Sequence, residues 1–497
     1  MTILQRRLGT YGLLALMVAF AVFFSVALFA HNSLRLDEAQ SLFQTNRDIA
    51  GMLNLVAQDV HVPLYHTLLH FWQIAFGQDI FVARMLSLVF FVGTIIMTYV
   101  LATYALGRRG VGLFAAFLVA ISPFMNWYGS EARMYTMLAF VTVLHAFFFV
   151  KLLRLSGSAR WVLWVLTGII GVYTHYFFIF VLLSEFATVL AIRKKSLDKH
   201  LLRNVIISGV VIAISLLPWL YYVYSLGLAN NTQPALGAPT AGDLFDTYAQ
   251  FIFGFQTPLV NTLIVSLWPI VVLLAFFALQ RAKRKVPLEI TLFVFLAVIP
   301  VLSAFVISIT IKPFYLSRYL IVSLPAVFIF VAWLLTRYRR RVAVVVSSIL
   351  VVMVGLLFTV QAISPNTPVK EDYRQVVDYL DANASASDVV VLAAPFTIYP
   401  VEYYYKGEAR LTTQPIWNRF EPGGVPPYNV ATVAAETKLN VDAYQHAWLV
   451  LSYDQGYNDK LKDYYSDHYK KLSEMKFSPG LTVYEYQTRY DKPVVIE

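Results

Sequence analysis

The sequence predicts a polytopic α-helical membrane protein with a small C-terminal α/β domain, and three observations support this prediction. First, 58% of the 497 residues are hydrophobic and only 14% are charged, whereas about a quarter of the residues of a soluble protein are charged. Second, the mean hydropathy is +0.62, and long apolar runs recur up to residue 362. Third, the apolar runs after residue 362 shorten to strand length. The absence of cysteine excludes disulfides, thiolate chemistry and cysteine-ligated zinc.

About eleven apolar stretches are candidate spans, because a membrane-spanning helix needs roughly 20 apolar residues. The first stretch is interpreted as a retained anchor, since its uncharged run is longer than the usual signal-peptide core of about 7–15 residues. The segments 111–150 and 161–192 are each interpreted as two spans, because basic clusters flank both of their ends. The candidate spans are 9–30, 80–106, 111–125, 134–150, 161–175, 176–192, 204–224, 259–280, 290–310, 320–336 and 342–362.

The distribution of basic residues predicts the orientation of the chain. The segments on one side of the predicted spans carry twenty Lys and Arg residues, and those on the other side carry six. Because basic residues accumulate on the cytoplasmic side, the N-terminus is expected in the cytoplasm and the C-terminal segment outside it. This bias also accounts for the formal net charge of +10, so nucleic-acid binding is not expected. The six outer cations are Arg35, Arg47, Arg84, Arg133, Lys312 and Arg318.

Two domains are expected, a transmembrane domain over residues 1–362 and an extracytoplasmic domain over residues 363–497. The first outer loop, 31–79, is expected to hold two short interfacial helices, at 48–58 and 63–76. The second long outer loop, 225–258, is rich in turn residues. Strands that alternate with helices indicate an α/β fold for the C-terminal domain. Its expected strands are 388–393, 447–452 and 481–486, and its expected helices are 373–380, 398–405 and 457–465.

Two adjacent acids, Asp37 and Glu38, follow the first predicted span in the segment SLRLDEAQS. Carboxylates at a bilayer surface are costly unless they are solvated or used. We therefore interpret this pair as the chemical centre of a membrane enzyme. The alternative is that Asp37 only caps the helix that begins after it.

Four of the outer cations, which are predicted on the same side of the membrane as these acids, are candidates for binding a phosphate group. Guanidinium and ammonium groups bind phosphate oxygens and stabilise the charge of a leaving phosphate. A carboxylate nearby can remove a proton from an attacking hydroxyl. The combination suits a lipid phosphate whose head group reacts. The four cations are Arg84, Arg133, Lys312 and Arg318.

Each of these cations also has a structural interpretation. Arg84 and Lys312 can extend towards lipid head groups while their aliphatic stems stay in the membrane. Arg133 can pair with Glu131 within one loop. Glu185, the only charge in the segment 161–192, can be a proton relay, although a structural role is favoured.

Metal binding is less well supported than phosphate binding. Three histidines are spaced like one helical face and could form a metal site with Asp59, but interfacial histidines more often form ordinary hydrogen bonds. Asp37 and Glu131 could hold Mg²⁺ or Mn²⁺ through oxygen ligands, but no DxD motif supports this. The three histidines are His61, His66 and His70.

A series of motifs, in this order, resembles bacterial family thirty-nine-like glycosyltransferases of the C-type (GT-C) membrane fold. This group includes the protein O-mannosyltransferases and the lipid A aminoarabinose transferases. The motifs are LRLDEAQS, DVHVPLYHTLLHFW, VARMLSL, ISPFMNWYGSEARMYTM and YTHYF, and they cover roughly residues 30–190. Weaker similarity is found in KPFYLSRYLIVSLPA, DYRQVVDYL and VEYYYKG.

The resemblance implies an extracytoplasmic active site and an isoprenoid-linked sugar donor. It places the catalytic carboxylate on Asp37, with Glu38 beside it. It also implies that Arg133 and the turn from Lys312 to Arg318 contact the donor phosphate. One departure is the sequence His-Val-Pro at 61–63, where the family commonly has His-Pro-Pro. The family varies widely in sugar and acceptor, so neither can be transferred.

We therefore expect an integral-membrane glycosyltransferase of the bacterial cytoplasmic (inner) membrane that acts in the cell envelope. It would move a sugar from a polyprenyl-phosphate donor to a lipid, glycan or protein acceptor outside the cytoplasm, in one displacement with inversion. Asp37 would act as the base, and no cofactor or metal is expected. The sugar or acceptor pocket is expected to be lined by His61, Tyr65, His66, Glu131, Tyr135 and Tyr315.

Two other functions compete with this hypothesis. A transporter or lipid flippase predicts ionisable residues in the middle of the bilayer, and only Glu185 meets that condition. A non-catalytic assembly subunit gives no reason for acids and cations to gather in the same outer loops.

Overall fold

The computed structural model describes residues 3–59, 61–155, 157–192, 199–226, 236–281, 286–420 and 425–489. The chain forms two compact units. The membrane unit contains the described residues of 1–30, 48–227 and 234–367, and the C-terminal unit contains those of 31–47 and 368–497. Residues 31–47, which we expected in the transmembrane domain, are thus part of the C-terminal unit. The predicted basic segments 193–195 and 283–285, and positions 227–235 of the second outer loop, lie outside the described residues.

The membrane unit is a bundle of long apolar helices, so the chain is a multi-pass membrane protein, as predicted. In the described part of the chain, eight helical segments are long and apolar enough to cross a membrane, or nine if α6 (Arg109–Ile121) and α7 (Pro123–Gly129), which meet at 61°, form one span. The eight are α1 (Ile3–His31), α5 (Ile80–Leu106), α8 (Tyr135–Arg154), α11 with α12 (Lys199–Ser215, Leu217–Ser225), α14 with α15 (Pro258–Ser266, Trp268–Arg281), α16 (Leu288–Thr310), η3 with α17 (Ser317–Ser323, Leu324–Leu335) and α18 (Arg340–Ile363).

The expected number of eleven spans is not confirmed, and the segment 161–192 accounts for much of the difference. It forms α9 (Ser158–Thr174), η1 (Tyr176–Phe178) and α10 (Ile179–Ile192). The two α-helices have 17 and 14 residues, fewer than the roughly 20 that a span needs. A helical hairpin is present where it was predicted, but each arm is short because both share one apolar run.

The second long outer loop contains a helix that was not predicted, α13 (Ala241–Phe253). The side chains of Thr240 and Asp243 form a capping box at its N-terminus. Such a box satisfies backbone N–H groups that the first turn leaves without partners. The sequence therefore contained a helix-start pattern at Thr240 and Asp243, but the turn residues before it led us to interpret the whole segment as a loop.

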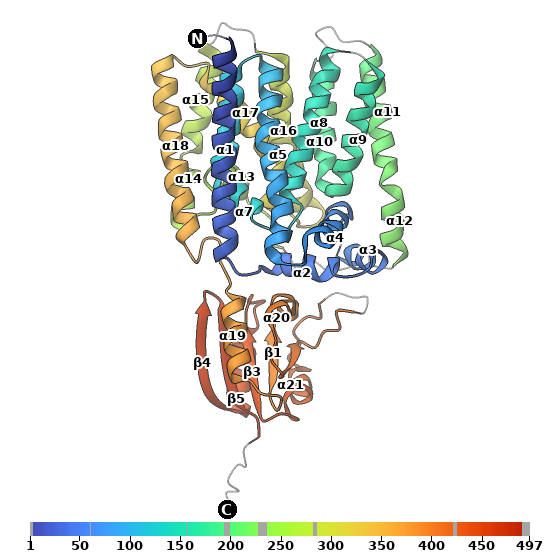
Figure 1. Ribbon diagram of the computed structural model, residues 1–497, viewed down its shortest axis with the longest axis vertical. Helices are drawn as coiled ribbons and strands as arrows, with labels where there is room; N and C mark the ends of the chain where they lie inside the picture. The colour runs from blue at the N-terminus through green and yellow to red at the C-terminus, as the bar shows by residue number, and fades with distance from the viewer. Residues whose placement is uncertain are drawn as a thin grey trace, which may run out of the picture. The chain divides into compact units, whose positions relative to one another are not determined.

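Two short helices, α3 (Ile49–Gln58) and α4 (Leu64–Phe76), confirm the predicted helices of the first outer loop. They lie at the end of the membrane unit away from the N-terminus (Figure 1). Met52, Val56 and Ala57 of α3 pack with Val62 and Trp219 in a buried apolar cluster. This cluster fixes the segment between α3 and α4 against α12.

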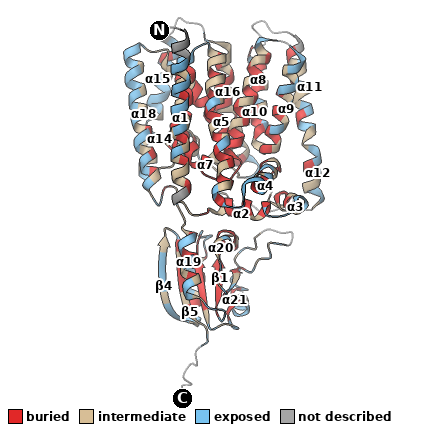
Figure 2. Cartoon of the chain, in the orientation of Figure 1, coloured by how far each residue is buried: buried red, intermediate tan, exposed pale blue. Residues whose placement is uncertain are grey.

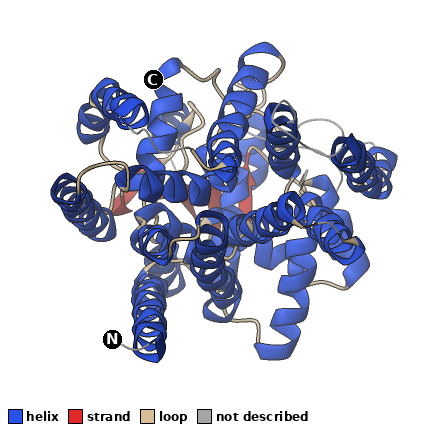
Figure 3. Ribbon diagram, turned by 90° about the horizontal axis from the view of Figure 1, so that it is seen from above, coloured by secondary structure: helices blue, strands red, loops and turns tan. Residues whose placement is uncertain are grey.

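Burial in the membrane unit follows the position of each helix. In Figure 2 the residues of α8 are mostly buried, whereas α15 and α18 carry many exposed residues. The exposed side chains of α15 and α18 are mainly apolar, as expected of helices that face lipid. Figure 3 shows the long helices nearly end-on, so they run roughly parallel to one another.

The C-terminal unit contains a five-stranded mixed sheet, which confirms the small α/β domain. The strand order is β2-β1-β3-β5-β4, with β1 parallel to β2 and β3, and with β5 antiparallel to β3 and β4. The register pairs Val389 of β1 with Arg410 of β2 and with Ala447 of β3. The strands are β1 (Val389–Ala393), β2 (Arg410–Gln414), β3 (His446–Leu451), β4 (Lys470–Ser478) and β5 (Leu481–Gln487).

Helices cover both faces of this sheet. Alternate residues of β1 point to opposite sides, and each set packs against a different pair of helices. Val390 and Leu392 pack with residues of α19 (Tyr373–Asn383) and α20 (Ile398–Tyr404). Val389 and Val391 pack with residues of α21 (Val433–Val441) and α22 (Asn458–His468). The predicted strands and helices are present within a few residues of their expected bounds. The strands β2 and β4 and the helix α21 were missed; both strands lie at sheet edges and are polar.

Candidate functional site

In the membrane unit, the residue that organises the candidate site is Arg133. It is 3% exposed, and its Nη2 atom lies 2.7 Å from Nε2 of His61. A guanidinium group can only donate hydrogen bonds, so Nε2 of His61 accepts and its ring proton is on Nδ1. His61 Nε2 also lies 3.4 Å from a carboxylate oxygen of Asp59. The sequence placed His61 and Arg133 on the same side, and the structure brings them into contact.

A chain of hydrogen bonds fixes the backbone at Arg133. Tyr65 of α4 shares a hydrogen bond with Ser87 of α5 at 2.7 Å. The Ser87 hydroxyl group also donates to the carbonyl oxygen of Arg133 at 3.0 Å. Thr136 donates to the carbonyl oxygen of Ser87 at 2.7 Å. All four residues are buried, so Tyr65, predicted as a pocket residue, positions Arg133.

Two further histidines lie close to this guanidinium group. His66 of α4 is fully buried, and its ring is nearly parallel to that of His61 at 6.0 Å between centroids. Burial, followed by the charges of Arg133 and His61, lowers the pKa of His66 well below its ordinary value. His175 lies between α9 and η1, and burial, followed by His61, Arg133 and Arg318, lowers its pKa to about 3. Both histidines are therefore neutral at physiological pH.

Tyr319 joins Arg318 to this group, which we call the histidine–arginine cluster: His61, His66, Arg133, His175 and Arg318. The Arg318 guanidinium carbon lies 5.5 Å from the centroid of the Tyr319 ring. The same ring lies 5.0 Å from that of His175 and 6.4 Å from that of Tyr135. Tyr135, predicted as a pocket residue, is thus connected to the cluster through Tyr319.

The remaining predicted residues of the membrane unit have other environments. Arg84 is buried, and its Nη1 donates to the carbonyl oxygen of Phe29 at 3.0 Å, so it stabilises the last turn of α1. Glu131 is 1% exposed. Lys312 is exposed. Tyr315 is hydrogen-bonded to Thr247 of α13 at 2.7 Å, and burial raises its pKa to about 12.

In the C-terminal unit, the adjacent acids Asp37 and Glu38 have different roles in α2 (Leu36–Thr45). Glu38 is fully buried and accepts a hydrogen bond from the backbone N–H of Arg35 at 3.1 Å, which closes a capping box. Asp37 is half-buried in the first turn of the same helix. The positive end of the helix dipole favours a negative charge at this position. The geometry separates a structural carboxylate, Glu38, from a more accessible one, Asp37.

Three residues that the sequence did not suggest interact with Asp37 or with its neighbour Arg35. Glu371 accepts a hydrogen bond from the Tyr453 hydroxyl group, and both interact electrostatically with Asp37 and Arg35. Burial is the main cause that raises the pKa of Glu371, and Asp37 raises it further. Burial, with the charge of Arg35, lowers the pKa of Lys370. We call Arg35, Asp37, Lys370, Glu371 and Tyr453 the carboxylate cluster.

Aromatic rings and cations attach α2 to the rest of the C-terminal unit. The Tyr404 hydroxyl group accepts from the backbone N–H of Leu34 at 2.9 Å. The Phe43 and Tyr399 rings lie 4.9 Å apart. The Arg419 guanidinium carbon lies 4.6 Å from the Phe43 ring centroid. These long-range contacts explain why residues 31–47 belong to this unit.

Two histidine lone pairs of the histidine–arginine cluster are already engaged by hydrogen-bond donors. The lone pair of His61 Nε2 is directed to Arg133, and that of His175 Nδ1 accepts from the backbone N–H of Phe177 at 3.1 Å. A histidine ligates a metal through such a lone pair, and the Arg133 charge repels a cation. Among the described residues, no group of three or more His, Asp or Glu side chains could hold a metal ion.

Glu185 lies apart from these clusters, in a buried polar group of α8, α9 and α10. One of its carboxylate oxygens lies 3.1 Å from His145 Nε2 and accepts from Trp164 Nε1 at 2.9 Å. His145 Nδ1 lies 2.9 Å from the Thr167 hydroxyl group. These contacts support the structural interpretation of Glu185.

The site residues that the sequence missed had weak signals. His175 is part of the YTHYF motif that supported the family resemblance, yet no role followed from that motif. Lys370 and Glu371 directly precede the DYRQVVDYL motif.

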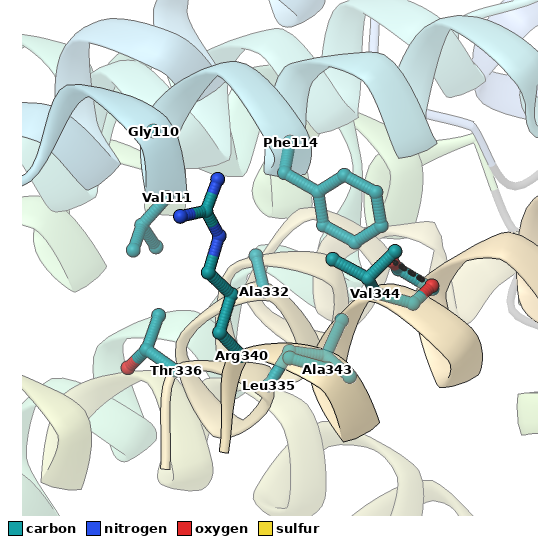
Figure 4. A pocket seen from close by; sticks show the side chains of 10 residues that line it. Gly110, Val111, Phe114, Ala332, Leu335, Thr336, Arg340, Ala343 and Val344 are labelled. Carbon is teal, nitrogen blue, oxygen red and sulfur yellow. Dashed lines mark hydrogen bonds between the residues drawn. The ribbon is translucent and has the colours of Figure 1, made fainter. Parts of the chain in front are cut away.

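Two cavities of the membrane unit are unrelated to the predicted site. One of about 230 Å³, between α6, α17 and α18, is lined by Gly110, Phe114 and Arg340 among others (Figure 4), and an apolar one of about 500 Å³ lies between α1, α6 and α18.

No family model and no curated protein matches the sequence. Among solved structures, the chain is similar to ArnT from Cupriavidus metallidurans in the apo state, with a TM-score of 0.60 and 15% identity over 96% of this chain and 98% of ArnT. It is also similar to ArnT from the same organism bound to undecaprenyl phosphate, with a TM-score of 0.58 and 15% identity over 95% and 98% of the two chains. This likeness confirms the GT-C fold over nearly the whole chain.

Proposed function

We propose that this chain is an integral-membrane glycosyltransferase that takes a sugar from a polyprenyl-phosphate donor. The observation that carries the proposal is the histidine–arginine cluster, in which a buried guanidinium group is surrounded by histidines that stay neutral. A guanidinium group binds phosphate oxygens through charge-assisted hydrogen bonds, which are stronger than bonds between neutral groups. In a GT-C membrane fold, the head group of a phosphorylated lipid is an anion of the right kind. ArnT bound to undecaprenyl phosphate has the same fold over 95% of this chain.

The proposed reaction is one displacement at the anomeric carbon of the sugar. A hydroxyl or amine of the acceptor attacks this carbon, the bond from the carbon to the phosphate oxygen breaks, and the acceptor proton moves to a base. The polyprenyl phosphate leaves with the bonding electrons and gains negative charge. Arg133 and Arg318 would stabilise that charge, because charge-assisted hydrogen bonds are among the strongest a protein can offer. The configuration at the anomeric carbon would invert.

Asp37 is the residue that we propose as the base. It is half-buried and lies in the first turn of α2, where a carboxylate is stabilised by the helix dipole. Its neighbour Glu38 is occupied as the helix cap and is not proposed as a catalytic group. The proposal places the reaction on the non-cytoplasmic side of the bacterial inner membrane, as the distribution of basic residues predicts. The acceptor would be a lipid, glycan or protein of the cell envelope.

The proposal is tested with the purified full-length protein in lipid vesicles and a labelled polyprenyl phosphosugar. Wild type should transfer the label to an extract of envelope acceptors, and Asp37→Asn should reduce the rate by about 10²- to 10⁴-fold, the usual contribution of a general base. Asp48→Asn, at an exposed cap of α3, is the matched control. Equal rates for wild type and Asp37→Asn would remove Asp37 from the mechanism. Movement of the lipid-linked sugar across the vesicle membrane without sugar transfer to an acceptor would favour the transporter or flippase hypothesis.

A further inference from the structure

The corner between α9 and η1 holds His175 in a fixed position. Its backbone N–H donates to the carbonyl oxygen of Gly171 at 3.1 Å. A Cβ atom at Gly171 would overlap the ring of Phe178, so this close approach requires glycine. The His175 ring also lies 5.2 Å from the Phe177 ring and 5.0 Å from the Tyr319 ring. The imidazole is therefore oriented by backbone and aromatic contacts on several sides.

The hydrogen bond from Phe177 determines which nitrogen of His175 carries the proton. Because the Phe177 N–H donates to Nδ1 at 3.1 Å, Nδ1 is the acceptor and the proton of the neutral ring is on Nε2. Burial and the nearby Arg133 and Arg318 keep the pKa of this group near 3, so the ring stays neutral under physiological conditions. His175 thus offers one N–H donor and no charge.

His66 also offers a neutral N–H donor, although no backbone hydrogen bond from the described residues fixes its ring proton. It is fully buried, and neither of its ring nitrogens has a hydrogen-bond partner among the described residues. The adjacent His61 cannot provide one from Nε2, because that atom accepts from Arg133. A buried polar group without a partner is unfavourable, so an uncharged N–H of His66 is available to a ligand.

We propose that His66 and His175 are neutral hydrogen-bond donors of an anion site whose positive charge comes from Arg133 and Arg318, and that its ligand is the phosphate of a lipid carrier. This inference rests on the proposed function and extends it to two residues with no assigned role in phosphate binding. The two arginines provide charge, and the two imidazoles provide directed N–H groups at no further electrostatic cost. The site therefore recognises the head group, and the isoprenoid chain contributes only apolar contact.

The test measures binding of undecaprenyl monophosphate to the full-length protein in nanodiscs. Undecaprenol, which lacks the phosphate, and inorganic phosphate are the comparison ligands. His175→Leu and His66→Leu remove the donors, whereas His175→Gln keeps a side-chain N–H and cannot titrate. His70→Leu on the same helix as His66 is the control. Thermal unfolding of each variant shows that it is folded, and if one leucine variant does not fold, the other carries the comparison.

We expect each of the two leucine variants to weaken binding of the lipid phosphate by about tenfold or more, the usual effect of one hydrogen bond to a charged group. His175→Gln and His70→Leu should stay within about threefold of wild type, and millimolar inorganic phosphate should compete. No binding by wild type would reject the proposed function itself. Binding by wild type that is unchanged in both leucine variants would overturn only this inference. Equal binding of undecaprenol would show that the phosphate is not recognised and would reject the phosphate site on which the proposed function rests as well.

Discussion

The hydroxyl group of Tyr404 accepts a hydrogen bond from the backbone N–H of Leu34 at 2.9 Å, across 370 positions of the chain. Leu34 is fully buried and lies three residues before Asp37. Ser33, the residue before it, accepts from the backbone N–H of Arg374 at 3.2 Å. The start of α2, and with it the proposed base, is therefore positioned by residues near the other end of the sequence.

Tyr404→Phe should weaken the attachment of α2. The Leu34 N–H would lose its acceptor while it remains buried, which costs about 1–3 kcal/mol. We expect a lower thermal unfolding temperature and slower sugar transfer. Tyr403→Phe, at the exposed neighbouring position of α20, is the control. If Tyr404→Phe behaves like that control in both measurements, this hydrogen bond does not position the acid.

Glu371→Gln should change the pH dependence of stability. Burial raises the pKa of Glu371 above 4.5, its ordinary value, so the folded state binds this proton more tightly than the unfolded state. The buried charge therefore destabilises the fold above the raised pKa, and this penalty vanishes below pH 4.5. Glutamine cannot ionise, so the variant should unfold at a higher temperature than wild type at pH 7.5, and the gain should shrink towards pH 4. A gain that grows as the pH falls would contradict the assigned sign.

Arg133→Met should abolish most of the proposed activity. It removes the charge that faces His61, His66 and His175, so kcat/KM for the lipid-linked donor should fall by about 100-fold or more. Arg133→Lys keeps the charge but not the planar donor geometry, and we expect an intermediate loss. Arg339→Met, at the exposed N-cap of α18, controls for the loss of one arginine. Full activity of Arg133→Met would show that this residue does not hold the donor.

Glu185→Leu should destabilise the membrane unit without a specific effect on chemistry. Trp164 would lose its acceptor and His145 would lose the carboxylate that lies 3.1 Å from its Nε2, and removal of one partner from a buried pair costs about 3–5 kcal/mol. Glu185→Gln keeps an oxygen for Trp164 and should cost less. The measurements are thermal unfolding and the transfer rate per folded molecule. A stable Glu185→Leu protein with no activity would indicate a proton-relay role instead.

The sequence alone determined the local features of this protein. Runs of apolar residues predicted the spans, and alternation with turn residues predicted three strands and three helices of the C-terminal unit, because hydrophobic periodicity depends only on neighbours along the chain. The predicted spans also placed His61, Tyr65, His66 and Arg133 on the same side of the membrane. Features with weak hydrophobic signals, such as the polar edge strands β2 and β4, were missed for the same reason.

Only the tertiary structure decided which of these residues meet. It placed Glu38 in the cap of α2 and left Asp37 half-buried beside it, directed Arg84 to the carbonyl oxygen of Phe29, and added His175 to the group around Arg133. It also joined residues 31–47 to the C-terminal unit. These outcomes depend on how helices and strands distant in sequence pack against one another, and a contact between distant residues leaves no trace in local composition or spacing.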